Sequence, residues 1–96
     1  MLVLITYDVS TQTPHGRKRL GKVAKKCAAH GQRVQNSVFE CNIDWSQFVK
    51  LQSELKNIIE PKEDSLRFYN LGNKYDGKVI HIGVKSSILL GGDLII

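Results

Sequence analysis

The sequence predicts one α+β domain in which two helices cover a single face of a small β-sheet. The 96-residue chain begins with an almost wholly apolar stretch of strand type. Two later stretches carry apolar residues at helical spacing, and several others alternate with the period of a strand. A chain of this length makes a single domain, residues 1–96, whose partial burial leaves room for a partner surface.

The central strand is predicted at residues 2–9, because this stretch is apolar or β-branched on both faces. Alternation divides it into two sets: Leu2, Leu4, Thr6 and Asp8 on one face, and Val3, Ile5, Tyr7 and Val9 on the other. Asp8 thus lies at the end of an otherwise apolar strand and is the only acidic residue before Glu40. We expect Asp8 to carry whatever chemistry the protein performs.

The first helix is predicted to begin at Pro14, behind the N-cap Thr13, and to end at Gly31 as its C′ residue. Its apolar stripe follows helical spacing and consists of Leu20, Val23, Ala24, Cys27 and Ala28. Arg17 and Arg19 stand near the start of this helix, where the macrodipole disfavours cations. An anion is therefore expected close to that turn.

The middle of the chain predicts a second strand and a second helix. Residues 33–41 alternate as one strand in which neither face is wholly apolar. Asp44 is the predicted N-cap of a helix that Pro61 stops. Trp45 and Phe48 fall on the apolar side of this helix, so both are expected in the core.

The last third of the chain predicts two longer strands and a short terminal one. Residues 65–71 and 78–84 have strand character and are separated by a turn bounded by glycines. A loop is expected at residues 86–92. The aliphatic residues of the ending, 93–96, are expected to pack or to pair with a strand of this chain or of a neighbour.

The order of these elements resembles the βαββαβ arrangement of a ferredoxin-like sandwich, which needs two strands between its helices. Either residues 33–42 supply both, or the fourth strand follows the one at 65–71. Two helices cover only one face of such a sheet, although the first strand is apolar on both. A second copy of the chain is the simplest cover, which predicts a two-fold homodimer with the tail 86–96 pairing with the partner subunit.

Fourteen Lys and Arg against nine Asp and Glu give a net charge of +5 and a pI near 9.4. This bias favours a polyanionic partner such as nucleic acid, although a merely basic surface explains the charge equally well. No apolar run approaches the ~20 residues of a membrane helix, and the N-terminus lacks the pattern of a secretion signal. Cys27 and Cys41 are isolated and expected to be reduced core residues. We therefore expect a cytoplasmic protein without a membrane partner.

Several segments together resemble one known family: LVLITYDVS at 2–10, GRKRL at 16–20, GQRVQNSVFEC at 31–41, EDSLRFYNLG at 63–72 and LII at 94–96. The chain resembles the small CRISPR adaptation protein of the Cas-two family, near its subtype I-C branch, over essentially its whole length. It departs from the family at Asp93, where proline is usual, and in the loop 86–92. The resemblance implies a ferredoxin-like fold with a short extra C-terminal strand, and homodimers whose terminal strands add to the other subunit's sheet.

The resemblance also implies a Mg²⁺- or Mn²⁺-dependent endonuclease acting on phosphodiester bonds of DNA or RNA, and a scaffold role with the Cas-one integrase during spacer acquisition. The family's metal-binding, catalytic aspartate matches Asp8. Positions tied to activity in some members match Arg17, Arg19 and Arg33, which we interpret as nucleic-acid contacts. Phe39 matches a further position of this kind, and Tyr7 matches the neighbour of the aspartate. Ser10 and Ser37 are supporting candidates on their own chemistry, because their hydroxyls could hydrogen-bond a phosphate or a ligand water.

The residues alone leave alternatives open. Mg²⁺ takes one or two carboxylates with waters and substrate phosphates, so a two-fold axis that pairs two copies of Asp8 would complete a site. Alternatively, the Asp8 side chain caps the turn that follows it. Tyr7 is equally a packed aromatic, and Ser10 and Ser37 equally cap backbone groups.

No second acid or histidine lies close to Asp8 in sequence to act as a general base, which favours weak catalysis. The second hypothesis is therefore a non-catalytic dimeric scaffold that holds double-stranded DNA for the integrase. A third, weaker one is a toxin-like ribonuclease on a similar fold.

Overall fold

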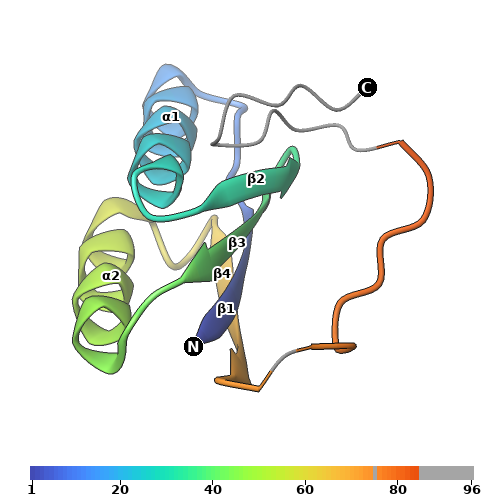
Figure 1. Ribbon diagram of the computed structural model, residues 1–96. Coiled ribbons are helices and arrows are strands. Elements are labelled where there is room, and N and C mark those ends of the chain that lie inside the picture. The colour runs from blue at the N-terminus through green and yellow to red at the C-terminus, as the bar shows by residue number, and fades with distance from the viewer. Residues whose placement is uncertain (75, 85–96) are drawn as a thin grey trace.

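A computed structural model describes residues 1–74 and 76–84 of the chain (Figure 1). The elements are, in order, β1 (Leu2–Asp8), α1 (Pro14–Ala28), β2 (Gln32–Gln35), β3 (Val38–Asn42), α2 (Trp45–Ile58) and β4 (Ser65–Gly72). The strands form one antiparallel sheet in the order β2-β3-β1-β4, and both helices lie on the same side of it (Figure 1). The α+β class and the βαββαβ order are confirmed.

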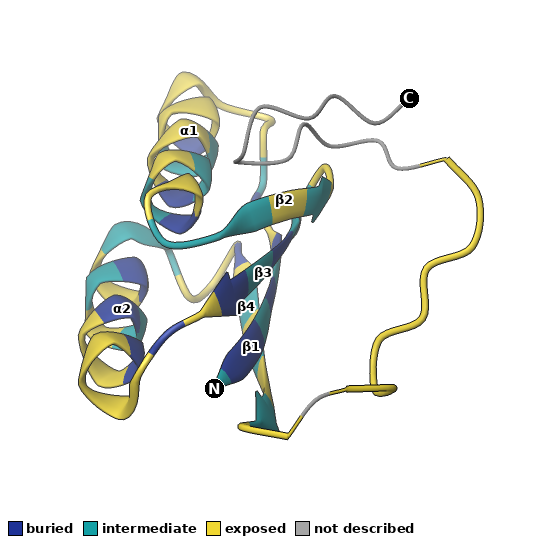
Figure 2. Cartoon of the chain, viewed as in Figure 1, coloured by how far each residue is buried: buried dark blue, intermediate teal, exposed yellow. Residues whose placement is uncertain are grey.

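The core lies between the sheet and the two helices, as the dark blue faces in Figure 2 show. The set of Val3, Ile5, Tyr7 and Val9 on β1 is buried in this core, and Leu2 of the other set is buried as well. On the opposite, open face of the sheet, Leu4 and Thr6 are half-buried and Asp8 is exposed. β1 pairs with β3 on one side and β4 on the other, which confirms it as a central strand.

Both helices begin at the predicted caps. Thr13 accepts a hydrogen bond from the Gly16 N–H at its Oγ1 (3.1 Å). Asp44 and Gln47 form a reciprocal capping box at the start of α2. α1 ends at Ala28 with Ala29 as its C-cap, so its C′ residue is His30, one residue before the predicted Gly31. A Cβ at Gly31 would overlap the Cys41 sulfur and the Glu40 carbonyl oxygen, so this glycine serves a close approach of the chain to β3.

The expectation for the aromatic residues of α2 is half right. Phe48 is buried and packs edge-to-face against Phe68, with ring centroids 5.9 Å apart. Trp45 is 64% exposed, and its ring meets that of Phe48 edge-to-face with centroids 5.5 Å apart. It is the first residue of α2, and the buried residues of this helix, Phe48, Leu51 and Leu55, all come later. The prediction of Trp45 as a core residue was wrong.

The predicted single strand at 33–41 is a hairpin. β2 and β3 pair antiparallel with Arg33 opposite Phe39 and Gln35 opposite Val38, and a register shift lies between the two pairs. The turn at Asn36 and Ser37 is bound to β1: the Tyr7 N–H donates to the Ser37 carbonyl (3.1 Å), and the Tyr7 hydroxyl donates to the Asn36 carbonyl (3.4 Å). Residues 32–42 therefore supply both strands that the fold needs between its helices.

The predicted strand at 78–84 is wrong, because these residues form no strand with any described part of the chain. They leave the end of β4 and run on the open side of the sheet (orange in Figure 1). Their aliphatic side chains are exposed, with Ile80 at 77%, Ile82 at 90% and Val84 at 70%. The loop 86–92 and the terminal strand 93–96 fall outside the described residues.

Among the helices that the structure describes, none is long and apolar enough to cross a membrane.

Candidate functional site at the end of the central strand

Asp8 is the last residue of β1 and lies on the open face of the sheet, exposed, opposite Ser65 of β4. Within the described part of the chain, its carboxylate accepts no hydrogen bond and forms no ion pair. A cap on the following turn would use the Ser10 N–H, but that group donates to Asp64 instead (3.0 Å). The Asp8 carboxylate is therefore available to a ligand from outside the chain.

Asp64, directly before β4, is the carboxylate that the structure does engage. Its side chain is fully buried and accepts from the N–H groups of Ser10 and Glu60 and from the guanidinium of Arg19. Burial alone would raise the pKa of Asp64, but the hydrogen bonds from Arg19 and from the two backbone N–H groups outweigh it and hold that pKa below its usual value. The sequence analysis missed this residue, because its run of charged neighbours is typical of a solvated loop.

The three predicted arginines have different surroundings. Arg19 is committed to Asp64 (2.8 Å) and lies 3.6 Å from Glu63, so the anion expected beside the start of α1 belongs to the chain itself. Arg17 is exposed, and its Nη1 donates to the Thr11 carbonyl (3.0 Å). Arg33 is exposed on edge strand β2, with its guanidinium carbon 5.2 Å from the centre of the Phe39 ring.

Tyr7 and Phe39 lie on the helix side of the sheet, away from Asp8. Both are buried, and their rings stack with centroids 6.2 Å apart. Burial raises the pKa of the Tyr7 hydroxyl, Cys27 adds to this effect, and the charge of Arg33 partly offsets it. These two aromatics belong to the core and hold the β2–β3 turn.

Ser10 and Ser37 take part through their backbones. The Ser10 N–H binds Asp64, and the Ser37 carbonyl extends the pairing of β1. A Cβ at Gly16 would overlap the Ser10 carbonyl oxygen, so α1 begins directly against this residue. The structure therefore brings Asp8, Ser10, Arg17 and Arg19 to one end of β1, and places Tyr7, Arg33 and Phe39 behind the sheet.

A divalent cation would find one suitable ligand here. The described residues contain no cluster of three or more His, Cys, Asp or Glu side chains that could hold a metal ion. Asp8 offers hard carboxylate oxygens of the kind that Mg²⁺ and Mn²⁺ accept, but such sites use one or two carboxylates together with waters and substrate phosphates. One chain therefore supplies half of the protein ligands for a two-carboxylate site.

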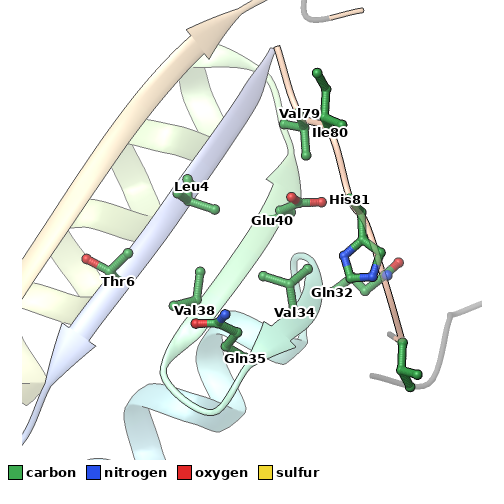
Figure 3. Close-up of a pocket in the computed structure, with 11 residues that line it drawn as sticks. Leu4, Thr6, Gln32, Val34, Gln35, Val38, Glu40, Val79, Ile80 and His81 are labelled. Atoms are coloured by element: carbon green, nitrogen blue, oxygen red, sulfur yellow. The ribbon is translucent and has the colours of Figure 1, made fainter. Parts of the chain in front are cut away.

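The open face of the sheet, on which Asp8 also lies, carries a hollow of about 570 Å³ that Asp8 itself does not line. Figure 3 shows Leu4, Thr6, Val34 and Val38 of the sheet on one side of it, facing Val79, Ile80 and His81 of the segment after β4. Most of these side chains are aliphatic, and those of the 79–81 segment are exposed. The face that carries Asp8 is therefore a largely apolar surface that residues 1–74 and 76–84 cover only in part.

The structure is that of a small, basic ferredoxin-like protein with an exposed carboxylate at the end of its central strand. Comparison with known proteins identifies its family. The family model "CRISPR associated protein Cas2" matches residues 1–79, so the chain belongs to the Cas2 family.

Two relatives resemble it over nearly their full lengths. The "CRISPR-associated endoribonuclease Cas2" of Chlorobaculum tepidum is 58% identical over 100% of both chains. The "CRISPR-associated endonuclease Cas2" of Halalkalibacterium halodurans is 59% identical over 99% of each. The crystal structure of Streptococcus pyogenes Cas2 at pH 6.5 superimposes with a TM-score of 0.75 at 54% identity, over 86% of this chain and 100% of that one.

Proposed function

We propose that the protein is a CRISPR adaptation protein, in the cytoplasm, with a metal-dependent endonuclease activity on phosphodiester bonds of DNA or RNA. The observation that carries this proposal is the exposed Asp8 carboxylate, which the described residues leave without a partner at the end of a buried strand. The names of the relatives support it, since they describe an endoribonuclease and an endonuclease.

The proposed active form is a two-fold homodimer that joins two open faces. Its support is the apolar surface of Leu4, Val34 and Val38 on the sheet, together with the exposed aliphatics of residues 79–84. Asp8 lies on the same face, so a two-fold axis close to the ends of β1 would bring two carboxylates into one site. Sedimentation over a range of concentrations tests this, and a monomer at high concentration would contradict it.

In that dimer, Asp8 and its copy are the proposed ligands of Mg²⁺ or Mn²⁺. The bound ion would polarise a phosphoryl oxygen and lower the pKa of a bound water. The role of the chain is to hold the ligand and the nucleic acid. Arg17 at the rim of the site and Arg33 on the edge strand are proposed phosphate contacts, whereas the guanidinium of Arg19 is already occupied.

Replacing Asp8 tests the nuclease directly. We expect Asp8→Asn to abolish Mg²⁺- or Mn²⁺-dependent cleavage of labelled RNA and duplex DNA while the circular dichroism spectrum stays unchanged. Asp76→Asn is the matched control, because Asp76 is also an exposed aspartate but lies in the turn after β4. Equal cleavage by the Asp8→Asn variant, or none by the wild type between pH 6 and 9, would contradict the proposal.

A non-catalytic scaffold that holds duplex DNA for the Cas-one integrase is the second candidate, and the charge of α1 favours it. This helix carries six Lys and Arg residues and no Asp or Glu. Lys18, Lys22 and Lys25 follow one side of it at helical spacing and form no ion pair with the described residues. Such a row suits a phosphate backbone, whose contacts depend steeply on salt.

One comparison of variants distinguishes the nuclease from the non-catalytic scaffold. If the protein is a scaffold, Asp8→Asn keeps duplex affinity, while Lys22→Ala weakens it and reduces the slope of log affinity against log salt by about one contact. A wild-type affinity that does not change with salt would contradict phosphate contacts altogether.

A further inference from the structure

We propose that Asp64 is a positioning residue that fixes the place of the Asp8 carboxylate, and that Arg19 acts through Asp64 and not by binding phosphate. The inference rests on the proposed function, because it concerns how the proposed metal ligand is held. It arises from the buried cluster around Asp64, for which the proposed reaction itself has no use.

The Asp64 carboxylate joins three separate segments of the chain. Its Oδ1 accepts from the Ser10 N–H (3.0 Å) and from Arg19 Nη2 (3.3 Å). Its Oδ2 accepts from Arg19 Nε (2.8 Å) and from the Glu60 N–H (2.8 Å). Four donors thus satisfy both oxygens of a side chain with no exposed surface. Hydrogen bonds to a buried charge are the strong kind, and removing one partner leaves the others unsatisfied.

These contacts hold the end of β1 and the start of β4, the two strands that meet at the proposed metal ligand Asp8. Ser10 follows Asp8 by two residues on the chain that leaves β1. Ser65, the neighbour of Asp64, is the residue of β4 opposite Asp8 and makes the last pair of that ladder. The end of a two-strand ladder is where pairing opens most readily. Asp64 ties the two strand ends together beyond this last pair, so the Asp8 backbone cannot shift without breaking a buried charged contact.

Arg19 connects helix α1 to the same carboxylate. Its guanidinium meets Asp64 edge-on through two nitrogens, and Glu63 lies 3.6 Å from the Nη2 nitrogen. Its side chain is only 17% exposed. A guanidinium in this position is neutralised by its own chain and is a poor partner for an incoming phosphate. Loss of Arg19 should therefore lower activity by loosening the Asp8 strand end, and should leave the salt dependence of nucleic-acid binding unchanged.

The test compares Asp64→Asn with two control variants in the full-length protein. Glu54→Gln removes the other close ion pair of α1, Lys26–Glu54 (2.9 Å), which lies away from the end of β1. Val23→Ala truncates a fully buried residue of α1 and lowers stability without touching the Asp64 cluster. Both controls should keep the metal dependence of the wild type at temperatures where all variants are folded.

Three measurements separate positioning from general stability. We expect Asp64→Asn to raise the Mn²⁺ concentration for half-maximal cleavage by about 10–100-fold, the usual loss when a group that supports a metal ligand is removed. Mn²⁺ binding without nucleic acid should weaken by the same factor. Amide hydrogen exchange at Ser10 and Ser65 should become faster, while exchange in the middle of β1 stays slow.

The arginine variants test the second half of the inference and cover the case in which Asp64→Asn fails to fold. Arg19→Lys keeps the charge but loses the two-nitrogen contact, so it should show a smaller loss of Mn²⁺ affinity and an unchanged salt slope. Arg17→Ala should reduce the salt slope and leave Mn²⁺ affinity alone. A salt slope that Arg19→Lys or Arg19→Ala changes would assign Arg19 to phosphate binding and overturn its role here.

Each outcome also distinguishes this inference from the proposed function. If wild type cleaves and Asp64→Asn matches Val23→Ala in both stability and Mn²⁺ dependence, Asp64 is only structural and the inference fails alone. If wild type neither cleaves nor binds Mn²⁺, the proposed nuclease fails and the inference fails with it.

Discussion

Replacing glycine by alanine should have opposite effects on stability at two positions of helix α1. A Cβ at Gly21 would meet no atom within 4 Å, whereas one at Gly16 would overlap the Ser10 carbonyl oxygen and lie 3.0 Å from its carbonyl carbon. Both of the atoms beside Gly16 are backbone, so no side-chain rotation relieves the overlap. Alanine should therefore stabilise the protein at one position and destabilise it at the other.

The magnitudes follow from two effects. Alanine is preferred over glycine in a helix by about 0.5–1 kcal/mol, so Gly21→Ala should raise the free energy of unfolding by that amount. Gly16→Ala gains at most the same amount from the helix preference, and it loses about 1–3 kcal/mol of unfolding free energy to overpacking. Because the helix preference enters both variants, the difference between them of about 1–3 kcal/mol measures the overlap itself. For a domain of this size, each 1 kcal/mol corresponds to about 4–8 °C in Tm.

Urea unfolding followed by circular dichroism, at one fixed protein concentration, measures both variants against the wild type. Gly16→Ala should also lower Mn²⁺ affinity, since it displaces the residue that binds Asp64. The reasoning is refuted if Gly16→Ala is as stable as Gly21→Ala, because the Ser10 carbonyl then does not lie against the helix.

Three further outcomes are expected. Phe48→Ala should cost about 3–5 kcal/mol of unfolding free energy but Trp45→Ala under about 1 kcal/mol, because Phe48 is buried and Trp45 is 64% exposed; equal losses in urea would contradict their placement. Burial raises the pKa of the Cys27 thiol to about 12 and that of the Cys41 thiol to about 11. Iodoacetamide at pH 7–8 should therefore modify both thiols only upon unfolding, and rapid labelling of the folded protein would contradict their burial. The pKa of the Asp64 carboxyl is lowered in the folded state, so the charged carboxylate stabilises the fold. In urea titrations, the wild type should exceed Asp64→Asn in free energy of unfolding by a constant amount above about pH 4, and this difference should disappear as pH falls through the folded pKa. A difference that grows on acidification would contradict the direction of the pKa shift.

Local patterns in the sequence were sufficient for the parts of the fold that local chemistry decides. Thr13 and Asp44 mark the starts of the helices because their side chains bind N–H groups three residues away. The alternation of β1 predicted which side chains share a face, with Asp8 on the face opposite Val3, Ile5, Tyr7 and Val9. These features depend on neighbours in the sequence, so a single chain is enough to find them.

The errors arose where distant residues decide. The hairpin turn at Asn36 and Ser37 has no glycine or proline, and alternation continues across it. The pairing of β2 with β3 and the bonds of the turn to Tyr7 distinguish it from a continuous strand. The polar run from Gln35 to Ser37 was the available signal. The alternating residues 78–84 have strand character, but they leave the end of β4 without pairing with either edge strand, β2 or β4, of the described sheet.

The candidate site shows the same division. Asp8 was found from its position, whereas Asp64 became visible only once Ser10, Glu60 and Arg19 were brought around it. Arg19 was assigned to an outside anion for the same reason: the sequence predicted that an anion should stand beside it, and the anion came from a residue 45 positions later.

The pairing of β1 also determines when the protein can fold during synthesis. Leu2 is opposite Gly72, so the ladder at the amino end of β1 closes only after about 70 further residues have been made. At the usual elongation rate of about 5–20 residues per second, this strand waits roughly 4–14 s before its second neighbour exists. Until then the apolar side chains of β1 lack the neighbour that β4 supplies, so the segment with the proposed metal ligand is translated well before its surroundings are complete.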